Sequence, residues 1–422
     1  RIINRDVSGY ETVMAGRLPY RDLYSLRNDA FTPPNQYITI WKYLIYSTVA
    51  QLMIRNESID PSVRQELEPL FEKSLAMSLP RRVRELTSRK LQATVLGTGG
   101  SFEQGVQSAP TTATWIERTD LLEEYLLANL DSAKYVVVFD PLDDDFQATA
   151  ASRDIRESYH NLLAGLFKAV QEVRSIFPPS QSGLRPIVFL RNDIYGQILD
   201  SDKSKWSMLA VELNWTERGV ERLLAWRLSR AESPEEATFA FNKAWQYAFA
   251  MAPQSFFRRT NARDISVFQH IQESTTRRPR DYIVALSVYA KKAIDSERAL
   301  ITHRTIKDSE HDLAKWMCEE VESELTGHVP DPSKLFDALA VVQRISFNFD
   351  QFKSAYDHEV REIADQMPDA ETALKLLFRF SVVGNVLLNK KLEFEFTSAR
   401  QVVRLDQPFV VAKAFQKSLG LN

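Results

Sequence analysis

The chain has 422 residues and a formal net charge of −3, with 44% hydrophobic and 26% charged residues. A single hydrophobic core stops growing at about 250 to 300 residues, so this length predicts two or three domains. The near-balanced charge excludes an overall electrostatic attraction to nucleic acid or to an anionic membrane. The single cysteine, Cys318, excludes an internal disulfide framework, and we expect it to be a small core residue of a protein from a reducing compartment.

The N-terminal region predicts a strand at residues 2–7 and a helix that begins near Trp41. In this helix, apolar residues recur at steps of three and four, which is typical of an amphipathic helix that covers a sheet. The apolar run at residues 43–54 is too short to span a bilayer, and no signal peptide opens the chain. We therefore expect a cytoplasmic protein without membrane contact. Since the first residue is Arg1 and not Met, we expect the chain to be part of a longer one.

Residues 61–130 combine predicted helices with a polar stretch. The helical pattern at residues 61–89 includes the basic run Arg81-Arg82-Val83-Arg84, which is read as a solvated face or as a contact for nucleic acid or a partner. The glycine-rich residues 97–101 have no lysine after them, so we expect a flexible polar insertion and not a phosphate-binding loop. Residues 120–130 predict a helix that leads into the next strand.

The chain is organised around a predicted strand at residues 135–139, which Asp140 follows directly. Five consecutive β-branched or aromatic residues are typical of a central strand of a parallel sheet, buried on both faces. Asp140 therefore lies at the carboxyl end of the strand, and ligands of open α/β sheets bind at that edge. A carboxylate there can hold Mg²⁺ against nucleotide phosphates, either directly or through water. The predicted function is nucleotide chemistry.

Four apolar residues followed by D-x-L-D-D resemble the Walker B segment of the AAA+ and STAND P-loop ATPases. The resemblance implies that Asp140 is the catalytic aspartate associated with Mg²⁺, and that Asp143 belongs to the acidic residues after the strand. Pro141 departs from the pattern, because many members carry there a second acid that orients the attacking water. No G-x-x-x-x-G-K-[ST] occurs in the 422 residues, so the resemblance implies a Walker A motif just before Arg1.

An alternative reading of D-P-L-D is the metal motif of inositol-monophosphatase-like phosphatases. That motif continues with Gly-Thr or Gly-Ser, which bring a backbone amide and a hydroxyl to the phosphate, whereas Asp144 and Asp145 occupy these places. The chain also lacks the upstream acidic cluster and the downstream Trp-Asp pair that would complete such a site. These residues favour the ATPase interpretation.

A second apolar strand is predicted at residues 186–190, after an amphipathic helix over residues 155–170 that ends before Pro178. A strand, a crossover helix and a second strand form a βαβ unit with parallel strands. The second strand ends in Arg191 and Asn192, and it resembles the sensor-1 strand of these ATPases. The resemblance implies that either Arg191 or Asn192 has the sensor role, Arg191 as a cation for phosphate oxygens or Asn192 as an amide that orients water.

Residues 213–300 have the composition of an α-helical lid. An R-R-P-R-D run interrupts it, and its last residue, Asp281, can cap the helix that follows. This run resembles the sensor-2 segment, which implies that Arg278 and Arg280 bind the nucleotide. Arg258-Arg259 are candidates for arginine fingers that act in trans.

The C-terminal region predicts helices followed by two strands. The helices are expected at residues 307–325, 333–342, 349–367 and 370–380, and the strands at 382–386 and 392–396. This order resembles the winged helix that AAA+, STAND and origin-recognition-type ATPases carry after the lid. Alternation predicts that Leu392, Phe394 and Phe396 face inward and that Glu393 and Glu395 face outward. Because outward acids repel phosphate, we expect a protein contact for this hairpin and not a DNA contact.

The predicted fold class is α/β, with a parallel-sheet P-loop NTPase core at residues 1–212, a helical lid at 213–300 and a winged-helix-like domain at 301–422. The expected function is an ATP-binding and ATP-hydrolysing switch or assembly ATPase that uses ATP and Mg²⁺. Its partners would be the nucleotide and either further copies of itself or an effector protein, and the resemblance implies a setting in bacterial mobile elements and antiphage defence. The alternatives are a non-hydrolysing NTPase-like scaffold and a nucleic-acid-binding regulator that uses the winged helix. The six histidines lack metal-ligand spacing, so no zinc site is expected.

Overall fold

The structure is a computed structural model that divides into two compact units, Arg1–Val211 and Glu212–Asn422. Four predicted features lie outside the described residues: the strand at 2–7, the basic run at 81–84, the glycine-rich stretch at 97–101 and the pair Arg258-Arg259. Among the described helices, none combines the length and the apolar character that crossing a lipid bilayer requires. The described residues are 9–13, 20–71, 115–140, 142–143, 146, 153–213, 215–235, 237–257, 264–397 and 402–421.

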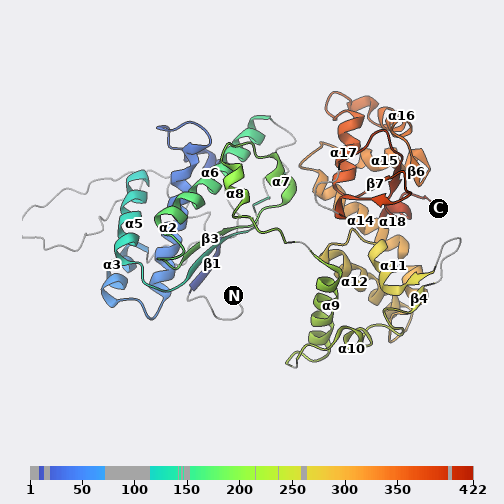
Figure 1. Cartoon of the computed structure of the whole chain (residues 1–422), viewed down its shortest axis with the longest axis horizontal. Coiled ribbons are helices and arrows are strands. Elements are labelled where there is room, and N and C mark those ends of the chain that lie inside the picture. Colours follow the sequence, from blue (N-terminus) through green and yellow to red (C-terminus); the bar gives the residue numbers. More distant parts are fainter. Residues whose placement is uncertain are drawn as a thin grey trace, which may run out of the picture. The chain divides into compact units, whose positions relative to one another are not determined.

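The first unit is an α/β structure built on a three-stranded parallel sheet with the order β1-β2-β3 (Figure 1). Its elements in chain order are β1 (Gly9–Val13), α1 (Tyr20–Ser25), the 3-10 helix η2 (Asn35–Tyr37), α2 (Ile38–Arg55), α3 (Pro61–Phe71), α5 (Trp115–Asn129), β2 (Tyr135–Phe139), α6 (Arg153–Ile176), β3 (Leu184–Val188), α7 (Asn192–Gln197) and α8 (Lys203–Ser207).

The central strand is β2, as its composition predicts. All five of its residues are buried, and its register pairs Tyr135 with Gly9 of β1 on one side and with Leu184 of β3 on the other. The parallel βαβ unit of β2, α6 and β3 is therefore confirmed. Asp140 follows the last residue of β2, which confirms its position at the carboxyl end of the strand.

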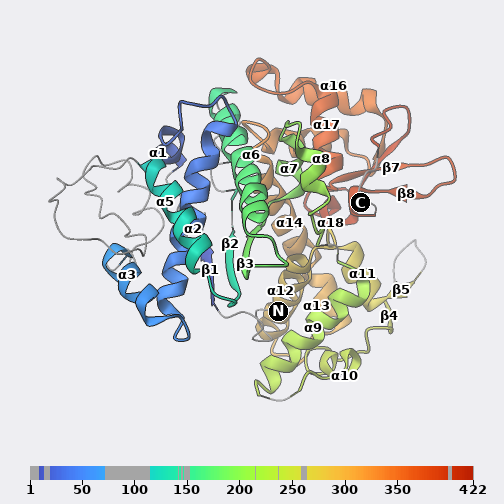
Figure 2. The same cartoon turned by 60° about the vertical axis from the view of Figure 1, so that its left-hand side comes forward.

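The helices α2 and α6 pack against each other and against the sheet, while α3 and α5 pack against α2 (Figures 1 and 2). The prediction that α2 is amphipathic is wrong, because its side chains are buried almost all round. Three helices cover it in addition to the sheet. The Trp41 indole N–H donates to the Leu162 carbonyl of α6 at 2.8 Å, and the ring meets Phe139 of β2 edge-on, with the ring centres 5.5 Å apart. Trp41 thus joins α2, α6 and β2.

The second unit is mainly helical and also contains a four-stranded antiparallel sheet (Figures 1 and 2). Its elements in chain order are α9 (Glu217–Glu232), α10 (Phe241–Trp245), β4 (Phe256–Phe257), β5 (Ile265–Ser266), α11 (Val267–Glu273), α12 (Pro279–Asp295), α13 (His303–Asp308), α14 (Glu310–Leu325), α15 (Ser333–Val342), β6 (Ser346–Phe347), α16 (Phe349–Glu359), the 3-10 helix η4 (Arg361–Ile363), α17 (Ala370–Arg379), β7 (Val383–Val386), β8 (Leu392–Glu393), the 3-10 helix η5 (Glu395–Thr397), β9 (Phe409–Val411) and α18 (Lys413–Gln416).

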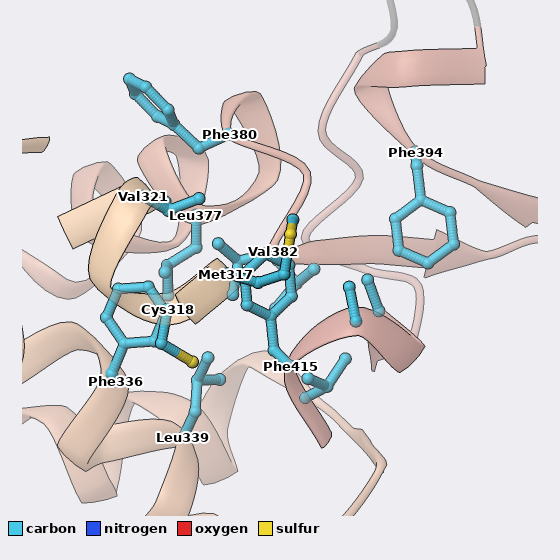
Figure 3. Packing of buried hydrophobic residues seen from close by; sticks show 14 of the residues in the cluster. Met317, Cys318, Val321, Phe336, Leu339, Leu377, Phe380, Val382, Phe394 and Phe415 are labelled. Carbon is cyan, nitrogen blue, oxygen red and sulfur yellow. The ribbon is translucent and has the colours of Figure 1, made fainter. Parts of the chain in front are cut away.

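One hydrophobic cluster runs through the second unit, from Val220 in α9 to Leu421 near its end. The residues proposed as a lid and those proposed as a winged helix therefore share one core, and their division at residue 300 stays a prediction. Figure 3 shows Cys318 of α14 in this cluster, with Phe336 and Leu339 of α15. Cys318 is a buried core residue as predicted, and burial raises the pKa of its thiol to about 11.

The predicted lid region is helical at α12, as expected, but contains two short strands just before α11. Residues 213–300 are predicted to be helical throughout, whereas β4 and β5 form a short antiparallel pair there. The helix begins at Pro279, earlier than predicted, so Asp281 is its third residue and not the residue before it. The Asp281 carboxylate still reaches back: it accepts hydrogen bonds from the Arg278 backbone N–H at 3.4 Å, the Thr276 backbone N–H at 2.9 Å and the Thr276 hydroxyl at 2.5 Å. The capping residue therefore also ties the preceding turn to the helix.

The C-terminal sheet has the order β6-β9-β7-β8 and contains the predicted hairpin, in which Asn385 of β7 pairs with Glu393 of β8. The expected inward position of Leu392 is wrong, because this side chain is 46% exposed, while Phe394 is buried as predicted. A Cβ at Gly384 would lie 2.6 Å from the Phe394 ring, so only glycine lets that ring cross the strand. The chain then enters η5, and the alternation ends.

Candidate functional site

The acidic loop after β2 is anchored to the core by apolar side chains and one tyrosine. Leu142 and Phe146 are buried, and the Phe146 backbone N–H donates to the Asp143 carbonyl at 3.0 Å. The hydroxyl of Tyr159, a fully buried residue of α6, donates to the Leu142 carbonyl at 2.7 Å. Asp143 is therefore held between two buried neighbours, which limits the positions that its carboxylate can take.

The carboxylates of Asp140 and Asp143 lie at this edge of the sheet. Asp140 is exposed and Asp143 is half-buried. Partial loss of hydration at the strand end, and secondly the negative charge of Asp143, raise the pKa of Asp140 above its ordinary value. The ionised form of Asp140 is thus disfavoured by its own surroundings, and a bound cation would relieve this cost.

Arg191, just beyond β3, connects the ends of the two strands. Its Nε and Nη2 donate to the two carboxylate oxygens of Asp193 at 3.1 Å and 2.7 Å, while its Nη1 lies 3.4 Å from Oδ2 of Asp143. The guanidinium carbon also lies 5.9 Å from the centre of the Phe146 ring. The bidentate contact orients the guanidinium, and the longer contact to Asp143 is the one that an incoming phosphate can replace at the smaller cost.

The structure thus brings together three of the predicted site residues at the carboxyl edge of the sheet. Asp140 and Asp143 come from the end of β2, and Arg191 comes from the end of β3. Asn192 is the first residue of α7 and its side chain is exposed. The roles of these residues in binding and catalysis stay predictions.

Arg278 and Arg280 belong to the second unit, so their role toward the nucleotide also stays a prediction. Both are held by glutamates one turn apart on α14: Arg278 is paired with Glu324, and Nη1 of Arg280 lies 2.5 Å from Glu320. Their side chains remain 40% and 71% exposed. The two arginines are therefore oriented by α14 and accessible to an anionic ligand.

The donor set at the sheet edge fits Mg²⁺. This ion is usually held by one or two carboxylates together with substrate phosphates and water, and Asp140 and Asp143 supply two carboxylates. No group of three or more His, Cys, Asp or Glu side chains that could hold a metal ion occurs among the residues with described positions. A metal at this edge would therefore depend on phosphate oxygens for the rest of its ligands.

Tyr159 and Asp193 contribute to this site, and the sequence reasoning does not single them out. Tyr159 reads as one apolar position of an amphipathic helix, and its hydroxyl contact to Leu142 joins residues 17 apart in the chain. Asp193 carries a local signal, because it follows Arg191 by two residues and can bind its guanidinium across a tight turn. A buried tyrosine needs a partner for its hydroxyl, which is the general signal for the first residue.

Comparison with known proteins does not assign this chain to a family. No family model matches the chain, and no curated protein matches it. Among solved structures, the crystal structure of Cdc6p from Pyrobaculum aerophilum matches with 12% sequence identity and a TM-score of 0.26, over 85% of this chain and 83% of that one. A TM-score this low supports no conclusion about fold or function, which therefore rest on the chain's own geometry.

Proposed function

We propose that this chain is an ATP-binding and ATP-hydrolysing switch or assembly protein of the AAA+ and STAND type. The observation that carries the proposal is the meeting of Asp143 and Arg191 at the carboxyl edge of a parallel sheet, beside Asp140. Carboxylates for Mg²⁺ and a cation for phosphate oxygens then converge on one point, which is the arrangement that phosphoryl transfer requires. When bound, Mg²⁺ would neutralise charge on the phosphates.

The outer edge of β3 supports the proposal, because a phosphate-binding strand could pair there. The Tyr135 backbone N–H donates to the Gly183 carbonyl at 3.1 Å and the Phe189 N–H donates to the Phe139 carbonyl at 3.0 Å. Odd-numbered residues of β3 therefore bond to β2, and even-numbered ones point outward. Pro186 is outward and lacks an N–H, which leaves the outward N–H groups of Leu184 and Val188 for a further strand.

A second observation also favours a further strand. Among the described residues, the outer edge of β3 has no strand partner. The chain after α8 also carries exposed apolar side chains at Met208, Leu209 and Val211. We infer that a strand carrying the phosphate-binding loop would pair with this edge of β3.

The test is ATP hydrolysis by the full-length protein with Asp140→Asn. We expect turnover to fall by at least about a hundredfold, because the metal and the phosphates lose their carboxylate partner. The thermal midpoint should not fall, since the raised pKa of Asp140 means that its ionised form costs stability in the folded protein at pH 7. Turnover by release of inorganic phosphate and the midpoint by calorimetry are the two readouts.

Asp154→Asn is the matched control, because Asp154 is an exposed acid in the first turn of α6. It should leave turnover within about twofold of the unchanged protein. Normal hydrolysis by a folded Asp140→Asn protein at ordinary Mg²⁺ concentrations would overturn the assignment. ATP binding without turnover in the unchanged protein would instead favour the non-hydrolysing scaffold, as Pro141 suggests.

A second candidate function, nucleic-acid binding through a C-terminal winged helix, is supported by the hairpin of β7 and β8. Glu393 lies mostly inside and faces Arg404, with 3.7 Å between its Oε2 and the arginine Nε. The tip carries Lys390 and Lys391, both exposed. The predicted repulsion of phosphate by Glu393 is therefore weaker than the sequence suggests, and duplex binding that falls with salt and with Lys390→Ala would favour this function. A role in antiphage defence stays a prediction.

A further inference from the structure

We propose that a cavity of about 630 Å³ in the first unit is a binding site for a small organic cation, such as an aliphatic diamine or polyamine. The cavity lies among the first half of α2, the start of α5 and the second half of α6, and η2 closes one side. Ligand sites in proteins typically enclose about 300 to 1,000 Å³, so the size suits a small molecule. Asp140, Asp143 and Arg191 do not line it, and the site is independent of the proposed nucleotide site.

Two largely buried lysines stand in the cavity wall, and each is already neutralised. Nζ of Lys42 lies 2.7 Å from Glu123 and 3.6 Å from Glu172. Nζ of Lys168 lies 2.6 Å from Asp202 and 3.2 Å from Asp200. The side chains of Lys42 and Lys168 are only 15% and 13% exposed, so these pairs are fixed parts of the wall. Because both ammonium groups are paired with carboxylates, neither is available to bind an anion.

The carboxylates around the cavity outnumber the ammonium groups. Each lysine faces two carboxylates, and the only further cation in this network, among the described residues, is the exposed Lys205 beside Asp202. Asp120 adds a carboxylate at the cavity wall and is exposed. Three of these carboxylates, Asp120, Glu172 and Asp202, line the cavity itself together with the two lysines, and the whole network of five carboxylates and three ammonium groups has an excess of two negative charges. A cavity with this field concentrates cations and repels anions.

The uncharged part of the wall also suits an amine with an apolar body. Asn35 provides an amide side chain at the wall. Phe31 stands at the opening with 54% of its surface exposed, and Ile38 and Ile116 provide apolar contact for methylene groups. An aromatic face at the opening is also favourable for a cation.

The test is calorimetric titration of the full chain with hexane-1,6-diamine, and with hexane-1,6-diol as a neutral probe of the same length. We expect saturable binding of one diamine per chain and no measurable heat of binding for the diol, because the attraction depends on charge. Asp120→Asn should weaken diamine binding by about five- to tenfold, since it removes one carboxylate and breaks none of the lysine pairs. Phe31→Ala should weaken it as well.

Glu124→Gln is the matched control, because Glu124 is an exposed acid one turn from Asp120 on α5 and does not line the cavity. This variant should bind the diamine within about twofold of the unchanged chain. Three results would each overturn the proposal: no saturable binding of the diamine, equal affinity for the diol, or equal weakening by Asp120→Asn and Glu124→Gln. The last of these would mean general attraction to surface charge.

Discussion

Tyr159 and Asp193 hold the two sides of the candidate nucleotide site. The Tyr159 hydroxyl holds the loop that carries Asp143, and Asp193 orients the guanidinium of Arg191. Neither residue would itself touch a phosphate in this arrangement. We propose that they are positioning residues, and that the hydrogen bond from Tyr159 to the Leu142 carbonyl helps to fix the loop on the acidic side.

Tyr159→Phe should therefore affect function more than stability. Loss of one buried hydrogen bond is expected to lower the free energy of unfolding by about 1 kcal/mol, because the Leu142 carbonyl no longer accepts from the Tyr159 hydroxyl. ATP turnover by the full-length protein should fall by about tenfold or more, since a loosened loop misplaces Asp143. Denaturant unfolding and phosphate release measure the two effects.

Tyr195→Phe provides the comparison for this variant. The Tyr195 hydroxyl makes only a long contact, 3.4 Å, to the Lys203 carbonyl, so its loss should change little. If both phenylalanine variants hydrolyse ATP at the rate of the unchanged protein, Tyr159 has no positioning role.

At the scale of elements, His270 joins α11 to α14 and α18. Its ring is buried and stacks on Phe257 with 3.7 Å between the ring centres. Nδ1 lies 3.0 Å from Nζ of Lys413, and Nε2 lies 3.3 Å from Oε1 of Glu310. Because a lysine ammonium can only donate, Nδ1 accepts and the ring is neutral, with its proton on Nε2.

Acid should therefore destabilise the second unit through this residue. Burial, and secondly the positive charge of Lys413, lower the pKa of His270 below its ordinary value, although Glu310 and Glu273 oppose the shift. The unfolded chain then binds a proton below about pH 6.5 that the folded chain resists, so stability is full above that pH and falls as the pH drops through the folded pKa. His270→Gln, which keeps an acceptor and a donor, should flatten the dependence of the thermal midpoint between about pH 7 and pH 5.

His358→Gln is the control for this pH dependence, because His358 is exposed on α16 beside Glu359. The thermal midpoint of this variant should depend on pH in the same way as that of the unchanged protein. An identical pH dependence for His270→Gln and the unchanged protein would show that another group controls the acid response.

At the scale of the whole molecule, the buried apolar residues within the described ranges form two hydrophobic clusters, one in each unit. The hydrophobic residues of the second unit form one cluster from Val220 to Leu421, and a separate cluster belongs to the first unit. The proposed lid supplies Trp245, Phe268 and Tyr282 to the shared cluster. A core that spans both proposed regions should unfold as one cooperative body.

Residues 212–422 should therefore fold alone and unfold in a single transition, whereas residues 301–422 should be markedly less stable because they lose the apolar surface of α11 and α12. Circular dichroism and calorimetry on the two fragments measure this. Two resolved transitions in the longer fragment, or equal stability of both fragments, would instead support a boundary at residue 300.

The sequence by itself determined the features that depend on local composition. Five apolar residues before Asp140 define β2 and its carboxyl end, and the helix predicted at residues 333–342 has the same bounds in the structure. A capping role of Asp281 follows from its side chain, although the helix begins three residues earlier than predicted and Asp281 reaches back to the Arg278 amide from the third position. Short-range hydrogen bonding and the periodicity of apolar residues suffice for such predictions.

Tertiary structure decided what depends on residues far apart in the chain. The pairing of Gly9–Val13 with β2, the strand β9 between β6 and β7, and the burial of α2 on nearly all sides arise from long-range packing. The contact of Arg191 with Asp143 joins residues 48 apart, and the cavity between Lys42 and Lys168 needs three helices to enclose it. The pattern of hydrophobic residues predicts whether a segment is a helix or a strand. Which elements pack together, and which side chains face each other, depends on long-range packing that a short stretch of sequence does not determine.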